Sequence, residues 1–269
     1  MSESLSTILV KTRWGAMEVI EGDAFVGGSL AVMGEYSPVE TKFLRMLAEG
    51  QVVVDVGANI GALTVPLAQV AKKVYAFEPQ RAVFELLQRN VERCGVKEKV
   101  VALQKACGAE SGRAALEVVQ KANWGSATLK EGNDVEVVRL DDVVEEKVGL
   151  LKVDVEGVER EVLQGAERVL EEGPLVFVEA DREESGKRVV EFLKEREFEL
   201  RWFISLLWKD NNFRGCKSNP FGLTCSFNLL GWKRGSDWDG KFEGLPKLED
   251  VPKFGSAPLD CIVRDVYAG

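Results

Sequence analysis

The stretch VVVDVGANIGALTVPLA, residues 52–68, passes from a β-branched apolar run through a glycine-rich turn to a helix-like run. This order predicts a buried strand that leads into a helix. Gly57 and Gly61 let the backbone turn sharply and admit a ligand against bare peptide N–H groups. Asn59 replaces the middle glycine of the dinucleotide fingerprint GxGxxG, and no Gly-Lys-Ser/Thr of a P-loop follows. A glycine turn used only for tight packing is the alternative.

Strand-like and helix-like segments alternate after this stretch. The expected strands are residues 73–79, 99–107, 136–140, 149–157, 175–181, 198–208 and 225–233. The expected helices are 82–95, 158–173 and 187–196, and a looser hairpin covers 115–130. The alternation predicts an α/β fold with a mostly parallel sheet and helices on both faces. Such sheets bind ligands at the carboxyl ends of their strands.

The first residues depart from this pattern. Residues 1–36 are expected to form an N-terminal hairpin or lid, because 8–20 and 24–34 resemble strands around a turn at 21–23. This extension would exclude water from the site.

A leading helix and a tail complete the expected organisation. Ser37 as N-cap and Pro38 at the first helical position predict a helix that closes at Gly50. Residues 235–269 contain proline and glycine without periodicity, so we expect a tail that lies over the surface or is partly mobile. The central domain would then cover residues 37–234.

Composition restricts the function classes. The chain has 269 residues, 45% of them hydrophobic, and a formal charge of −9, so neither nucleic acid nor a membrane is an expected partner. No segment reaches the ~18 apolar residues of a membrane span, and the first residues lack a signal-peptide core. Five scattered cysteines without a CxxC pair favour reduced thiols, and hence a cytoplasmic protein. The composition leaves open whether the protein forms a homo-oligomer.

The sequence contains no histidine. Ser/His/Asp and Cys/His triads and histidine-rich metal sites are therefore excluded. Any chemistry must use carboxylates, amines, hydroxyls, thiols or a cofactor.

Acidic residues follow several expected strands, at Asp55, Glu78, Asp154 to Glu156 and Glu179 to Asp181. A carboxylate at the position of Glu78 could accept hydrogen bonds from both hydroxyls of a ribose. A glycine turn beside such a strand end, without a basic residue for a pyrophosphate, suits a nucleoside-bearing ligand that lacks phosphates. S-Adenosylmethionine is such a ligand.

Four motifs together resemble the FkbM-type methyltransferases: VVVDVGANIG (52–61), VYAFEPQ (74–80), RLDDVV (139–144) and LKVDVEGVEREVLQGA (151–166). The resemblance runs from about Gly34 to Trp232, and KVDVEGVE followed by VLQGA is its narrower signature. It implies a Rossmann-like class I methyltransferase fold with a seven-stranded, mostly parallel sheet. It also implies S-adenosylmethionine as cofactor for the domain at 37–234.

The resemblance implies roles for individual residues. The cofactor-binding residues would be Glu40, Asp55, Gly57, Asn59, Gly61, Glu78, Ala106, Cys107 and Asp154, and the catalytic residues Asp154 and Glu156. Within this set, Glu78 would hold the ribose hydroxyls, while Ala106 and Cys107 would border the adenine at the tip of their strand. Glu40 is the weaker candidate, for the charged end of the cofactor.

Asp154 and Glu156 would lie beside the transferred methyl. With an alcohol as acceptor, one of them would remove or stabilise its proton, and Lys152 is the reserve candidate. The structural alternatives are that Glu156 caps the following helix and that Lys152 only extends from its strand. A Mg²⁺-dependent version would use Asp154, Asp181 and Asn212, but their spacing is unspecific and no metal is expected.

The predicted function is an S-adenosylmethionine-dependent O-methyltransferase that acts on a small-molecule or sugar-like (glycan) hydroxyl. A nicotinamide-dependent oxidoreductase on a related fold and a non-catalytic nucleoside-binding module are the rivals. The loop at 206–224 is expected to determine the acceptor, with Phe213 and Phe221 as candidate walls of its pocket.

Overall fold

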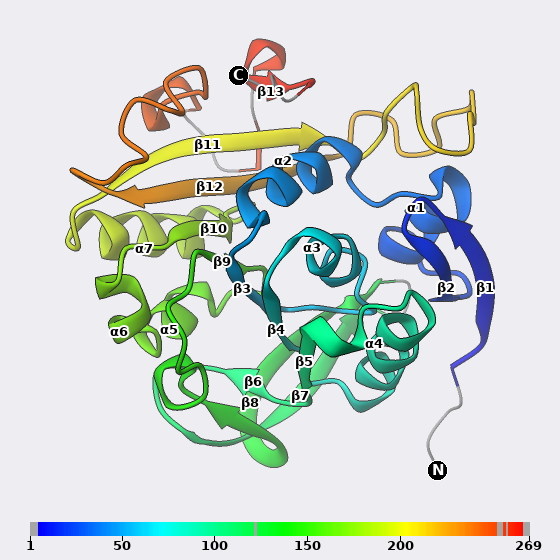
Figure 1. Cartoon of the computed structure of the whole chain (residues 1–269), viewed down its shortest axis with the longest axis horizontal. Coiled ribbons are helices and arrows are strands. Elements are labelled where there is room, and N and C mark those ends of the chain that lie inside the picture. The colour runs from blue at the N-terminus through cyan, green and yellow to red at the C-terminus, as the bar shows by residue number, and fades with distance from the viewer. Residues whose placement is uncertain (1–4, 121–122, 252–254, 257, 266–269) are drawn as a thin grey trace.

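A central eight-stranded sheet organises the computed structural model, which describes residues 5–120, 123–251, 255–256 and 258–265 (Figure 1). In spatial order the strands are β13 (Ile262–Val263), β11 (Phe198–Leu206), β12 (Cys225–Lys233), β10 (Leu175–Glu179), β9 (Leu150–Val153), β3 (Val52–Val56), β4 (Lys73–Phe77) and β5 (Val100–Leu103). The strands from β10 to β5 are parallel, whereas β12 runs antiparallel to β10 and β11. The predicted Rossmann-like sheet is confirmed, and β13 adds a short strand to the seven expected.

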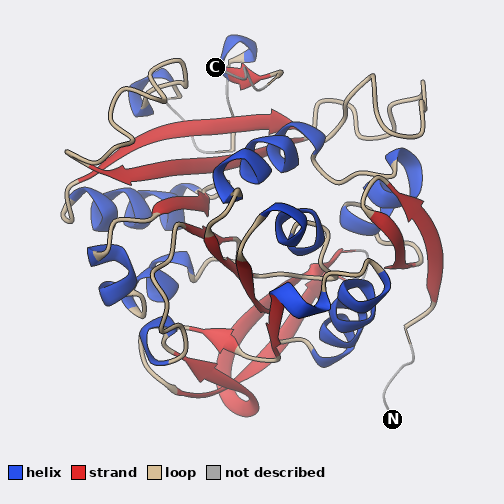
Figure 2. Cartoon of the chain, in the orientation of Figure 1, coloured by secondary structure: helices blue, strands red, loops and turns tan. Residues whose placement is uncertain are grey.

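Helices cover both faces of the sheet (Figure 2). One face carries α2 (Pro38–Ala48), α3 (Thr64–Val70) and α4 (Arg81–Arg93), and the other carries α5 (Glu159–Gln164), α6 (Glu167–Glu171) and α7 (Glu183–Lys194). In β3, Val53 packs with the first layer and Val54 with the second. Successive strand residues point to opposite faces, so a strand buried on both faces must be apolar throughout.

The N-terminal segment corrects one prediction. β1 (Thr7–Thr12) pairs with β2 (Gly15–Ile20), but the expected strand at 24–34 contains the helix α1 (Val26–Met33). The Asp23 carboxylate accepts hydrogen bonds from the N–H groups of Phe25 at 3.4 Å and Gly27 at 2.6 Å, which supports the helix start. The hairpin turn consequently lies between β1 and β2, not at 21–23.

A second, smaller sheet lies at the lower side of Figure 1. Its strands are β6 (Ala106–Cys107), β8 (Asn123–Val138) and β7 (Gly112–Gln120), in that order. The strand predicted at 99–107 is therefore two strands in different sheets, β5 and β6. The predicted hairpin at 115–130 is part of the β7–β8 ribbon.

The helix predicted at 158–173 is interrupted at Gly165, where α5 gives way to α6. A Cβ at Gly165 would overlap the carbonyl oxygen of Gly108. The Gly165 carbonyl itself accepts a hydrogen bond from the N–H of Asp141 at 3.0 Å. Contact with these two neighbouring segments, which the sequence periodicity does not contain, explains the break.

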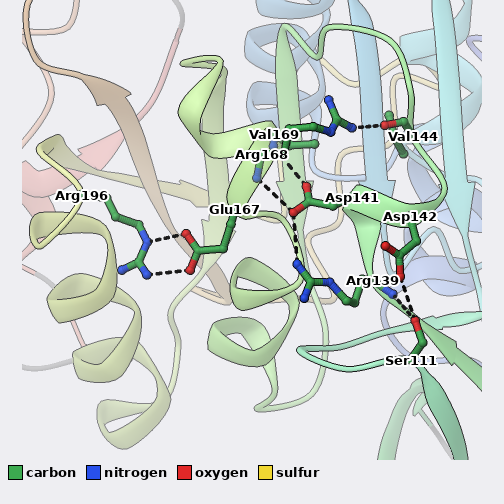
Figure 3. A network of polar contacts seen from close by, with 9 residues as sticks. All are labelled: Ser111, Arg139, Asp141, Asp142, Val144, Glu167, Arg168, Val169 and Arg196. Atoms are coloured by element: carbon green, nitrogen blue, oxygen red, sulfur yellow. Dashed lines mark hydrogen bonds and ion pairs between the residues drawn. The ribbon is translucent and has the colours of Figure 1, made fainter.

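A polar network holds α6 in place (Figure 3). The Asp141 carboxylate accepts hydrogen bonds from the N–H groups of Arg168 at 3.0 Å and Val169 at 3.1 Å, and so caps the start of α6. Glu167 accepts two hydrogen bonds from Arg196, at 2.7 and 3.0 Å, that join α6 to the end of α7. Asp141 of the RLDDVV motif therefore stabilises the scaffold.

The described part of the C-terminal tail packs on the sheet. β13 pairs in parallel with β11, and the ring of Phe242 lies 6.1 Å from that of Phe43 and 5.3 Å from that of Trp232.

Short 3₁₀ helices are η1 (Lys97–Lys99), η2 (Leu140–Asp142), η3 (Leu248–Asp250) and η4 (Leu259–Cys261). Over the residues that the structure describes, no helix is long and apolar enough to cross a bilayer.

Candidate active site

A cavity of about 550 Å³ lies at the carboxyl ends of β3, β4, β9 and β10. Five of the residues predicted from the sequence line it: Gly57, Asn59, Glu78, Asp154 and Glu156. A larger cavity of about 820 Å³ between α2 and the C-terminal tail has none of the predicted site residues among its described lining. The smaller cavity is therefore the candidate site.

The turn after β3 adopts a left-handed backbone conformation that favours glycine. Gly57 has φ +82° and Asn59 φ +50°, both in the left-handed region. The N–H groups of Gly57 and Ala58 donate to the carbonyl of Phe77 at 3.0 Å, which ties the turn to β4. A Cβ at Gly57 would overlap the carbonyl oxygen of Asp154. Gly57 thus allows the ends of β3 and β9 to meet behind the cavity.

Glu78 directly follows β4 and is 5% exposed. Its Oε2 accepts a hydrogen bond from the N–H of Asn59 at 3.0 Å, and its Oε1 accepts one from Gln80 at 2.8 Å. Burial raises the pKa of Glu78 to about 7, although both hydrogen bonds and the charge of Lys152 oppose this shift. Each carboxylate oxygen keeps a lone pair for a further donor.

Asp55 and Lys152 form a buried ion pair at the cavity, where Lys152 is part of the lining and Asp55 lies behind it. The Lys152 Nζ lies 3.0 Å from Asp55 Oδ1 and 3.5 Å from Asp154 Oδ2, and it donates to the carbonyl of Gly57 at 3.2 Å. The Thr64 hydroxyl donates to Asp55 Oδ2 at 2.6 Å. Burial lowers the pKa of Lys152, but the neighbouring carboxylates outweigh this effect and raise it. Lys152 thus holds both carboxylates and the Gly57 turn together, and its role as the reserve base stays a prediction.

Asp154 and Glu156 stand on the turn after β9. The side chain of Asp154 is 37% exposed, whereas Glu156 is more buried and forms an ion pair with Arg182. Burial raises the pKa of Glu156, while Arg182 opposes the shift. The Glu156 carboxylate therefore pairs with a side chain and does not cap α5, which begins at Glu159.

Comparison with known proteins identifies the family of the chain. Residues 55–200 match the family model described as the methyltransferase FkbM domain. The chain belongs to the FkbM methyltransferase family. This FkbM-family chain is 31% identical over 178 residues to the hexuronic acid methyltransferase AglP of Haloferax volcanii, which covers 63% of this chain and 72% of that protein.

A second relative and a solved structure extend the comparison. The FkbM-family chain is 32% identical over 163 residues to the 31-O-demethyl-FK506 methyltransferase FkbM of Streptomyces tacrolimicus, covering 45% of this chain and 61% of that one. Its fold is similar to that of an S-adenosylmethionine-dependent O-methyltransferase from Thermotoga maritima, with a TM-score of 0.52, 16% identity, and coverage of 84% and 77% of the two chains. The predicted methyltransferase is confirmed, and the oxidoreductase alternative is set aside.

Glu40 of this FkbM-family chain lies behind the wall of the cavity and is 4% exposed. Its Oε2 accepts hydrogen bonds from the hydroxyls of Ser226 at 2.7 Å and Ser37 at 3.1 Å, and from the amide of Asn228 at 3.4 Å. Burial raises its pKa. The side chain thus joins α2 to β12, and its contact with a cofactor stays a prediction.

Ala106 and Cys107 do not lie at the tip of the strand that follows β4. That strand, β5, ends at Leu103, and both residues are buried in β6 of the small sheet. Neither is among the described residues that line the cavity, and Gly61 is likewise outside this lining. Cys107 packs in the core, where burial raises the pKa of its thiol. The predicted adenine contact of both residues stays a prediction.

The metal alternative has no support in the geometry. The Asn212 amide donates to the carbonyls of Lys209 and Cys216, both at 3.0 Å, and accepts from the Cys216 N–H, also at 3.0 Å. It is thus engaged within its own loop, apart from Asp154 and Asp181 in the cavity. Among the described residues, no group of three or more acidic or cysteine side chains is arranged to hold a metal ion.

Phe25, Tyr36 and Arg182 are among the residues of the cavity wall that have no role in the sequence analysis. The aromatic wall comes from Phe25 and Tyr36, in place of the predicted Phe213 and Phe221, which are absent from the described lining. The loop at 206–224 reaches the cavity with Leu207 and Thr224, whereas the N–H of its Phe213 donates to Glu35, between α1 and α2, at 2.6 Å. No motif of the sequence marks Phe25 or Tyr36, which reach the cavity from the segments that flank α1.

Proposed function

We propose that the chain transfers a methyl group from S-adenosylmethionine to a hydroxyl group of a small molecule or glycan. The observation that carries this proposal is the juxtaposition of the Gly57 turn and the buried Glu78 carboxylate at one wall of the cavity. Two relatives, a hexuronic acid methyltransferase and a 31-O-demethyl-FK506 methyltransferase, support a hydroxyl-bearing acceptor by their names. The five free cysteines suit a reducing, cytoplasmic setting.

The residues present fit such a cofactor. Glu78 has a free lone pair on each oxygen for the ribose hydroxyls, and the turn at Gly57 to Asn59 lets the methionine part approach the backbone. Asp154, a partly exposed carboxylate 3.5 Å from Lys152, would hold the α-ammonium group. The cavity of about 550 Å³ is within the usual range for small-molecule sites.

S-Adenosylmethionine supplies, when bound, an electrophilic methyl on a positively charged sulfur. The chain has to align the acceptor oxygen with that methyl, since in-line placement alone contributes several kcal/mol to the lowering of the barrier. Phe25 and Tyr36 border the cavity and exclude water from it. A carboxylate of the wall must take up the hydroxyl proton, because the chain has no histidine.

Calorimetric titration tests the cofactor. We expect micromolar binding of S-adenosylmethionine and of S-adenosylhomocysteine, with no heat from NAD under the same conditions. The carboxylate of Glu78 and the missing second glycine of a dinucleotide motif are the physical reasons. Binding of NAD alone would contradict the proposal, and silence from all three ligands would favour a decayed or partner-dependent pocket.

Replacing Asp154 with alanine is expected to lower methyl transfer on the order of 10²-fold or more, because a charged contact to the reactive end of the cofactor is lost. Folding should be preserved, since Lys152 keeps Asp55 and the Gly57 carbonyl as partners. The measurement is release of S-adenosylhomocysteine together with urea unfolding. Asp237→Ala, at an exposed position outside the cavity, is the matched control. Full turnover by folded Asp154→Ala would remove Asp154 from the site.

A further inference from the structure

Glu179 is the last residue of β10 and lines the cavity between the ends of β9 and β12. Val178 pairs with Val153 of β9, so Glu179 is level with Asp154 on the neighbouring strand. On its other side, Glu179 pairs with Asn228 of β12. The register of the sheet thus directs Glu179 to the same edge as the predicted catalytic residues.

The carboxylates of the wall differ in their partners. Glu78 accepts two backbone hydrogen bonds, Asp154 lies 3.5 Å from Lys152, and Glu156 pairs with Arg182. Asp181 lies 3.8 Å from Arg182. Within the described structure, Glu179 is the wall carboxylate for which no hydrogen bond or ion pair is found, although the cavity wall partly shields it from water.

A base must offer a free oxygen lone pair to the proton that it accepts, and a carboxylate held by a cation is a weaker base. We propose that Glu179 is the general base that accepts the proton of the acceptor hydroxyl. This role rests on the proposed function, because it requires a hydroxyl acceptor in the cavity. In this assignment Asp154 binds the cofactor, and Glu179 accepts the proton of the acceptor hydroxyl.

The step balances as a displacement. The acceptor oxygen forms a bond to the methyl carbon while the carbon–sulfur bond breaks, and that electron pair stays on sulfur. The hydroxyl proton passes to the Glu179 carboxylate, which becomes a carboxylic acid. The products are the methyl ether, S-adenosylhomocysteine and the proton, which leaves Glu179 for solvent before the next turnover.

The electrostatic surroundings of Glu179 suit a base. Burial raises its pKa well above the ordinary range, and nearby negative groups reinforce this shift. The charged and titratable groups around it are Tyr36 before α2, Asp154 and Glu156 after β9, Glu159 of α5, and Asp181 and Arg182 after β10. A raised pKa means that Glu179 loses its proton, and so becomes competent as a base, only as the pH rises through that value.

The test compares wild type, Glu179→Gln and Glu184→Gln, the last at an exposed position of α7 outside the cavity. Release of S-adenosylhomocysteine is measured with a panel of hexuronic acids, neutral hexoses and their glycosides, and the best wild-type acceptor is used for kinetics. We expect Glu179→Gln to lower kcat by about 10²–10⁴-fold, with KM and S-adenosylmethionine affinity changed less than about threefold. The rise of kcat with pH should disappear in this variant.

The outcomes separate the base from other roles. A raised KM with unchanged kcat would show that Glu179 only binds a cationic group of the acceptor, and would overturn the proposal. Weaker S-adenosylmethionine binding with unchanged kcat would assign it to the cofactor, with the same consequence. No turnover of the whole panel by wild type would overturn a sugar hydroxyl as the acceptor on which Glu179 acts, whereas wild-type turnover matched by Glu179→Gln overturns the base alone.

Discussion

Replacing Lys152 with methionine is expected to lower the free energy of unfolding by about 3–5 kcal/mol, the usual cost of leaving one partner of a buried ion pair unpaired. Asp55 is fully buried, and Lys152, 3% exposed, lies 3.0 Å from it. Methionine has a similar length, so the main change is the loss of the charge that compensates Asp55. Urea unfolding at neutral pH measures the difference.

Two further variants sharpen this experiment. Lys72→Met removes an exposed lysine and should change the free energy of unfolding by less than about 0.5 kcal/mol. The double variant Asp55→Asn with Lys152→Met should recover much of the loss, because it leaves no buried charge without a partner. If Lys152→Met lowers the free energy of unfolding by less than about 1 kcal/mol, Asp55 does not need Lys152 to compensate its charge, and the prediction is wrong.

Replacing Glu78 with alanine is expected to weaken S-adenosylmethionine binding by about 10²–10³-fold, since two hydrogen bonds from ribose hydroxyls to a charged acceptor are lost. Calorimetry measures the change, and Glu98→Ala, an exposed glutamate outside the cavity, is the control. Thermal unfolding of both variants verifies the fold. An affinity within about threefold of wild type would place the ribose elsewhere.

The same residue predicts a pH dependence of binding. Glu78 has a pKa of about 7 because it is buried, and hydroxyl donors favour its ionised form. S-Adenosylmethionine affinity should therefore fall as the pH is lowered through about 7, and binding at lower pH should release a proton that buffers of different ionisation enthalpy detect. The pKa of Glu78 is higher in the folded than in the unfolded chain. The free energy of unfolding of the unliganded protein should therefore fall as the pH rises to about 7 and stay at the lower value above it. Affinity independent of pH between 6 and 8 would contradict this role.

Much of the site could be predicted because it depends on strand ends. The apolar run 52–56 demands burial on both faces, and a strand buried in this way ends at an edge where Gly57 and Glu78 meet. Asp154 and Glu156 likewise line the cavity because they follow the buried strand β9. The sequence predicts less well the segments whose position depends on distant contacts: α1 lies where a strand is expected, and Ala106 and Cys107 belong to another sheet.

The sequence by itself determined the family, the parallel sheet and the acidic strand ends, because periodicity and motif spacing are local properties of the chain. Only the tertiary structure decided which carboxylates form ion pairs with a lysine or arginine. Lys152 is paired with Asp55 and Arg182 with Glu156, whereas no ion pair of Glu179 is found among the residues that the structure describes. Pairing depends on distances between residues far apart in the sequence, and burial sets how strongly each charge acts, so neither can be read along the chain.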